Sequence, residues 1–111
     1  MSINSLLIRA FLAGGTASCV IFAAIALPGE AHVTIDNFSF KLPVLTIPAG
    51  TTVSWENDDD IAHTVVATDG TFRSAALDSE DKFSFTFDKP GTFDYFCSLH
   101  PRMQGQIVVT P

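Results

Sequence analysis

The clearest structural signal in the sequence is a strict alternation of apolar and polar residues near its middle. Phe83, Phe85 and Phe87 are separated by Ser84 and Thr86, and a period of two is typical of a β-strand with one buried face. Similar short patterns recur along the chain and are separated by turn residues, which predicts an all-β domain of about seven short strands, an antiparallel sandwich or barrel. The other predicted strands lie at residues 33–40, 44–47, 53–55, 63–68, 93–97 and 106–110.

The first predicted strand changes phase along its length. Val33 and Ile35 alternate with polar neighbours, and Phe38 and Phe40 then continue the alternation on the opposite face. This change predicts a bulge or bend between Asp36 and Phe38. Residues 72–81 show no clear period, and we expect them to be irregular or to form a single helical turn.

The first 31 residues have the composition of a secretory signal peptide. A short start with one arginine, Arg9, is followed by residues 10–27, an 18-residue stretch without charge or proline. Small residues then precede a predicted cleavage after Ala31, and residues 24–26 are the alternative cleavage site. A retained membrane anchor is the other interpretation, because 18 apolar residues are close to the length that spans a bilayer. We therefore divide the chain into a leader, residues 1–31, and one domain, residues 32–111, in a periplasmic or exported protein.

Charge and cysteine content restrict what the mature domain does. The formal net charge of the chain is −6, which disfavours nucleic acids and anionic membranes as partners. Cys19 lies in the leader, so Cys97 is the one cysteine of the predicted domain and has no internal partner for a disulfide. A single cysteine in an exported domain is therefore a candidate metal ligand.

The segment Cys97-Ser98-Leu99-His100-Pro101-Arg102-Met103 has the spacing Cys-x2-His-x2-Met. A thiolate, an imidazole and a thioether, completed by one more histidine, make the trigonal copper site with a weak axial ligand that proteins use for electron transfer. The chain contains three histidines in all, and His63 begins a predicted strand and lies 34 positions before Cys97. In a Greek-key sandwich this separation can bring a strand end beside a loop between the last two strands.

The chain resembles the cupredoxins, and within that family the amicyanin group. The segments that carry the resemblance are residues 47–58, the run Ala62-His63-Thr64, and residues 91–97, followed by a ligand loop with two residues between successive ligands. The resemblance covers residues 33–110 and implies an all-β, cupredoxin-like Greek-key β-sandwich of about seven to eight strands with one type 1 copper ion. It implies that His63, Cys97, His100 and Met103 bind the metal, and that Asn57 ties the His63 loop to the ligand loop through Ser98.

These features predict a blue copper electron-transfer protein that is not an enzyme and is a monomer. A copper-binding or copper-delivery protein with the same ligands is the alternative. The resemblance implies a c-type cytochrome as electron acceptor and an amine dehydrogenase as donor. We expect an apolar docking patch at Leu99 and Pro101, flanked by an acidic loop at Asp58, Asp59 and Asp60.

Overall fold

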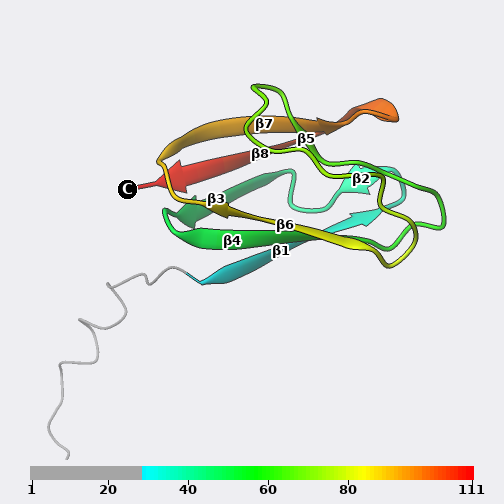
Figure 1. Ribbon diagram of the computed structural model, residues 1–111, viewed down its shortest axis with the longest axis horizontal. Helices are drawn as coiled ribbons and strands as arrows, with labels where there is room; N and C mark the ends of the chain where they lie inside the picture. The colour runs from blue at the N-terminus through cyan, green and yellow to red at the C-terminus, as the bar shows by residue number, and fades with distance from the viewer. Residues whose placement is uncertain (1–28) are drawn as a thin grey trace, which may run out of the picture.

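Two four-stranded β-sheets lie face to face in the computed structural model, which describes residues 29–111 (Figure 1). The predicted leader therefore lies outside the described residues except for its last three. Within residues 29–111, no helix has the length and apolar character needed to cross a membrane. The strands are β1 (Glu30–Asp36), β2 (Ser39–Phe40), β3 (Val44–Pro48), β4 (Thr51–Asn57), β5 (Val66–Ala67), β6 (Lys82–Phe87), β7 (Gly91–Cys97) and β8 (His100–Thr110).

The fold class is confirmed as an all-β sandwich, but both of its sheets are mixed. One sheet has the order β2-β1-β4-β6 and the other the order β3-β8-β7-β5. Strand β1 runs parallel to β4, and β3 runs parallel to β8, whereas the remaining pairs are antiparallel. Strand β1 includes Glu30 and Ala31, which pair with Thr52 and Val53. The predicted cleavage after Ala31 thus falls within β1, and it remains a prediction.

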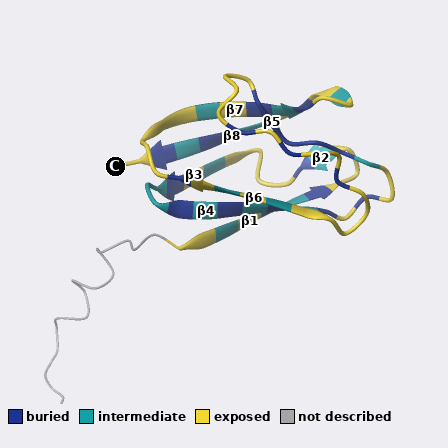
Figure 2. Ribbon diagram, in the orientation of Figure 1, coloured by how far each residue is buried: buried dark blue, intermediate teal, exposed yellow. Residues whose placement is uncertain are grey.

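The core between the sheets is built from the residues that the period-two patterns place on one face (Figure 2). Trp55 of β4 is fully buried and its ring lies edge-on to Tyr95 of β7, with 5.4 Å between centroids. Phe72, Phe83 and Phe87 surround the same indole. These aromatic contacts connect the two sheets and fix their relative position.

The bulge or bend predicted between Asp36 and Phe38 is a tight hairpin turn. Strands β1 and β2 are antiparallel with Asp36 paired to Ser39, so only Asn37 and Phe38 connect them. Both connecting residues have positive φ, 53° and 55°, as in the turn that matches the twist of a two-residue hairpin. The change of phase in the sequence therefore marks a reversal of the chain.

One end of the sandwich gathers the β1–β2 turn, the β4–β5 connection and the β7–β8 hairpin (Figure 1). The predicted strand at residues 63–68 is reduced to β5, because His63 forms only an isolated bridge with Leu77. Residues 72–81 are irregular apart from such bridges. This end holds all of the residues that the sequence identified as metal ligands.

Candidate metal centre

The predicted ligand loop is largely part of a strand. Strand β7 ends at Cys97 and β8 begins at His100, so that only Ser98 and Leu99 lie between them. The pairing moves from Phe96 with Gln104 directly to Cys97 with His100. Residues 101–103 are therefore extra residues on β8, a large bulge of the kind that redirects side chains. Within this bulge Met103 is buried, whereas its neighbours Pro101 and Arg102 are exposed.

Three donor atoms converge at this end of the sandwich. Cys97 Sγ lies 3.7 Å from His63 Nδ1 and 3.7 Å from His100 Nδ1, and the three ligand atoms all lie within 4.8 Å of one another. His63 and Cys97 are fully buried, while His100 is partly exposed. The main chain of His63 is held by reciprocal hydrogen bonds with Leu77, at 3.1 and 2.7 Å.

Cys97 lies in surroundings that favour its thiolate. Burial acts to raise the pKa of Cys97, but the hydrogen bond donated by Thr64 N at 3.3 Å opposes it, as do the nearby His63, His100 and Thr64 side chains. Together these contacts lower the pKa of the thiol from 9.0 to about 6. The thiolate is the form of cysteine that binds metals.

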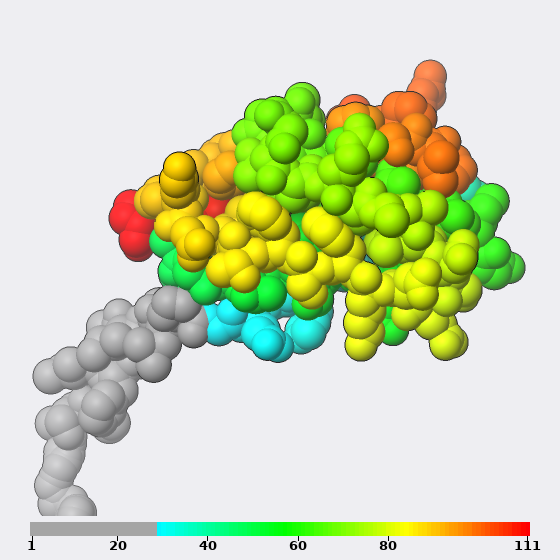
Figure 3. All heavy atoms as spheres, viewed as in Figure 1, coloured from blue at the N-terminus to red at the C-terminus, as the bar shows by residue number. Residues whose placement is uncertain are grey.

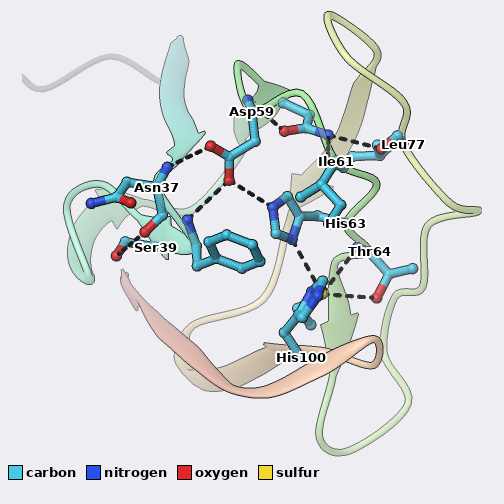
Figure 4. Close-up of polar contacts among 11 residues, drawn as sticks. Asn37, Ser39, Asp59, Ile61, His63, Thr64, Leu77 and His100 are labelled. Atoms are coloured by element: carbon cyan, nitrogen blue, oxygen red, sulfur yellow. Dashed lines mark hydrogen bonds and ion pairs between the residues drawn. The ribbon is translucent and has the colours of Figure 1, made fainter.

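The second imidazole nitrogen of His63 faces a carboxylate, as Figure 4 shows. His63 Nε2 lies 2.7 Å from Asp59 Oδ2. Burial acts to raise the pKa of Asp59, but hydrogen bonds from Phe38 N, Asn37 N and His63 outweigh it and lower the pKa to about 2. An ionised carboxylate can only accept hydrogen bonds, so His63 Nε2 carries the proton and His63 Nδ1 is left free to bind a metal.

This position of Asp59 corrects one expectation from the sequence. The three aspartates were predicted to form one acidic loop open to solvent, yet only 9% of Asp59 is exposed. Asp58 and Asp60 are exposed. Nothing in a run of three aspartates indicates that the middle side chain is buried. The one available signal was the position of Asp59, four residues before His63.

The contact expected between Asn57 and Ser98 is also wrong. Asn57 Nδ2 donates to Ile61 O and Leu77 O, both at 2.9 Å, and thus stabilises the His63 loop from within. Ser98 is bound by Thr64, whose Oγ1 accepts a hydrogen bond from Ser98 N at 2.7 Å and lies 2.8 Å from Ser98 Oγ. Thr64 follows His63 directly, and that adjacency was the available signal for its role.

A shallow surface cavity of about 490 Å³ lies beside the donor atoms and is lined by the ligand hairpin and Phe38. Leu99 is 51% exposed and Phe38 is 49% exposed. The Phe38 ring stands edge-on to the rings of His63 and His100, with centroid distances of 5.4 and 5.0 Å. In Figure 3 the ligand hairpin and the loop before His63 lie at the same end of the molecule. Phe38 was predicted to lie in a strand, and its contact with the two imidazoles was not expected from the sequence.

The donor set fits copper. Two imidazole nitrogens and one thiolate in a trigonal group are the equatorial ligands of electron-transfer copper, and a thioether is the common weak axial ligand. The buried Met103 lies on the same hairpin as Cys97 and His100. Three of the four predicted ligands, His63, Cys97 and His100, therefore have their donor atoms close together in the structure.

Comparison with known proteins agrees with this chemistry. The family model described as the cupredoxin-like domain matches residues 6–109. Amicyanin of Paracoccus versutus is 34% identical over 93 residues, which cover 78% of this chain and 70% of that protein. A purple cupredoxin from Nitrosopumilus maritimus has a TM-score of 0.68 and 32% identity, covering 72% of this chain and 99% of that one.

A copper-containing nitrite reductase from Thermus scotoductus also matches, with a TM-score of 0.69 and 36% identity. The match covers 77% of this chain but only 23% of the reductase, so the likeness is to one part of that enzyme. The family match and the set His63, Cys97, His100 and Met103 support one type 1 copper ion as the cofactor. The chain belongs to the cupredoxin-like family and is related to the amicyanins.

Proposed function

We propose that this protein is an electron carrier that passes one electron at a time between redox proteins in the periplasm or outside the cell. The observation that carries the proposal is the convergence of Cys97 Sγ and the Nδ1 atoms of His63 and His100 within 4.8 Å of one another. Copper supplies the electron chemistry when it is bound, by alternating between Cu(II) and Cu(I). The protein supplies a rigid frame in which the ligands need little rearrangement between the two states.

Each ligand has a distinct part in this proposal. Cys97 is a thiolate ligand in a buried, hydrogen-bonded position. His63 is fixed from behind by Asp59, and His100 stands at the surface, where an electron can leave. Met103 is proposed as the weak axial ligand, because it is buried within the bulge that follows His100. A soft thioether favours Cu(I) and thus helps one site serve both oxidation states.

We further propose that the protein is not an enzyme. The copper enzymes related by fold need additional imidazoles for a second metal, and this chain has three histidines in total. Two of them are assigned to the centre described above. The third, His32, lies on β1 and pairs with Ser54 of β4, among the strands of the sheet opposite the β7–β8 hairpin.

The docking surface is proposed to be the apolar rim around His100. Leu99 and Pro101 are exposed on the ligand hairpin and line the surface cavity together with His100. Apolar patches of this kind mark protein interaction sites. The partners that fit are a c-type cytochrome as acceptor and an amine dehydrogenase as donor, each meeting a monomer of this protein.

A copper-delivery protein is the second candidate, and the position of His100 favours it. His100 is partly exposed and borders an open cavity, which gives a chelator or an acceptor protein access to the metal. The test is a stopped-flow measurement in which the reduced, copper-loaded protein is mixed with an oxidised c-type cytochrome in the presence of a competing copper chelator. A carrier reoxidises and retains its copper, whereas a delivery protein releases copper to a competing chelator on the same timescale.

A further inference from the structure

The carboxylate of Asp59 joins two parts of the centre that are far apart in the sequence. Its Oδ1 accepts a hydrogen bond from Asn37 N at 2.6 Å, and its Oδ2 accepts one from Phe38 N at 2.9 Å. The same Oδ2 lies 2.7 Å from His63 Nε2. Asn37 N and Phe38 N are fixed donors, so each oxygen of Asp59 accepts at least one hydrogen bond. An amide at this position could not do the same, because it presents a donor on one side.

The turn that Asp59 holds is costly to form by itself. Asn37 and Phe38 both lie in the left-handed region, with φ of 53° and 55°. Asparagine tolerates this region, whereas a bulky aromatic residue there is an outlier. Such conformations persist only where the surroundings determine them, and they cluster at functional sites. Here the two N–H groups of the turn point at one buried carboxylate.

The consequence of this turn is the placement of the Phe38 ring. The ring stands edge-on to both imidazoles, at interplanar angles of 88° to His63 and 86° to His100. About half of the side chain is exposed, so burial in the core does not account for it. Phe38 instead lines the surface cavity together with residues of the ligand hairpin. The ring therefore lies between solvent and the two imidazoles.

We propose that Asp59 is a positioning residue that couples the orientation of His63 to an aromatic cover formed by Phe38. One carboxylate keeps the proton on His63 Nε2 and, through the Asn37–Phe38 turn, keeps the Phe38 ring against both imidazoles. The cover limits the approach of water and small chelators to the metal and restricts the movement of His100. The benefit of this cover for electron transfer rests on the function proposed above. The coupling between Asp59, His63 and Phe38 does not depend on that function.

The test compares Asp59→Asn with Asp58→Asn, a matched control that removes the same charge from an exposed neighbour. In the metal-free protein, ¹⁵N NMR of His63 should show a single Nε2–H tautomer for the parent and Asp58→Asn, and a mixture for Asp59→Asn. Loss of a hydrogen-bonded partner of a metal-binding histidine typically costs about 10- to 100-fold in metal affinity. We expect Cu(II) affinity to fall by that factor in Asp59→Asn and to stay within about twofold in the control.

The coupling is tested by a double-mutant cycle with Phe38→Ala. Phe38→Ala should leave the His63 tautomer unchanged and speed the removal of copper by a chelator several-fold. Asp59→Asn should also speed removal, and the double variant should be no faster than Asp59→Asn alone. Independent, multiplicative effects of the two changes would overturn the coupling, as would identical behaviour of Asp59→Asn and Asp58→Asn.

Two features keep the test decisive. If Asp59→Asn does not fold, Phe38→Ala alone decides on the cover, because its side chain is half exposed and an unchanged removal rate would contradict the proposal. The NMR measurement needs neither copper nor a redox partner. A protein that failed as an electron carrier would therefore still show whether Asp59 fixes the His63 tautomer.

Discussion

Thr64 and Ser98 are joined by a hydrogen bond of 2.7 Å from Ser98 N to Thr64 Oγ1. Thr64 follows His63 and Ser98 follows Cys97, so this one contact connects the segments that supply two of the ligands. The same hydroxyl lies 3.7 Å from Cys97 Sγ and can donate to it. Since Thr64 Oγ1 also lies 2.8 Å from Ser98 Oγ, its donor and acceptor capacity is fully used.

Replacing Thr64 by valine should weaken metal binding with little change in shape. The substitution leaves Ser98 N without its acceptor, and we expect Cu(II) affinity to fall by about 10- to 100-fold. Thr64→Ser keeps the hydroxyl and should lie within about threefold of the parent. Competition titrations against a chelator measure both variants. Equal affinities for Thr64→Val and the parent would show that the hydroxyl does not orient the ligands.

The metal-free protein should become more stable as the pH rises from 6 to 9. The pKa of Cys97 is about 6 in the folded protein against an ordinary value of 9.0, so ionisation of the thiol favours the folded state. That contribution is complete above pH 9.0 and is lost as the pH falls through about 6. Denaturant unfolding at several pH values should show the rise in the parent. Cys97→Ser should remove this component, and a slope that survives in Cys97→Ser would assign it to other groups.

Met103→Gln should lower the reduction potential of the copper-loaded protein. An amide oxygen is a harder donor than a thioether and stabilises Cu(II) relative to Cu(I). Each tenfold change in that preference corresponds to about 59 mV for a one-electron couple. Voltammetry of the parent and the variant measures the difference. A potential that stayed unchanged would place Met103 in the core and outside the ligand set.

Electron transfer to a basic c-type cytochrome should slow as salt is added. Asp58 and Asp60 are exposed on the loop that leads to His63, and salt screens their attraction beyond about 8 Å at physiological ionic strength. The double variant Asp58→Asn/Asp60→Asn should lose most of the salt dependence. Asp59 is left unchanged in this test, because its carboxylate is bound to His63. A double variant with the full salt dependence would mean that the loop does not steer the partner.

Leu99→Asp tests the apolar part of the same surface. Leu99 is 51% exposed beside His100, and a charge there should oppose close docking of an apolar partner surface. Stopped-flow rates should fall at every salt concentration, while the visible spectrum stays that of the parent. A rate that was unchanged, or that was raised at low salt by the added negative charge, would contradict an apolar contact.

The sequence predicted the sandwich and the metal donors for a physical reason. Period-two alternation reports which face of a strand is buried, as in β6 and β4. Three of the four predicted ligands, Cys97, His100 and Met103, stand within seven residues of sequence. The parallel pairing of β1 with β4 was not predictable, because alternation gives the buried face of a strand but not its neighbour. For the same reason the register shift that turns Met103 inward had no local signal.

The contacts that support the ligands were predicted least well. Asp59 was assigned to solvent, although its carboxylate is satisfied by the β1–β2 turn, which lies more than 20 residues away in sequence. The contact of Ser98 with Thr64 joins segments 34 residues apart. Such pairings are set by how the loops meet at one end of the sandwich, and no short pattern encodes them. Phe38 shows the same limit, since its position depends on a turn that only the folded chain defines.

The central claim is that Cys97, with His63 and His100, holds one type 1 copper ion. The most direct measurement is the visible absorption spectrum of the purified protein after addition of one equivalent of Cu(II), recorded for the parent and for Cys97→Ser. A short thiolate–Cu(II) bond gives an intense charge-transfer band, so the parent should turn strongly coloured and the variant should remain nearly colourless. A colourless parent, or a Cys97→Ser variant with the same intense band, would contradict the account.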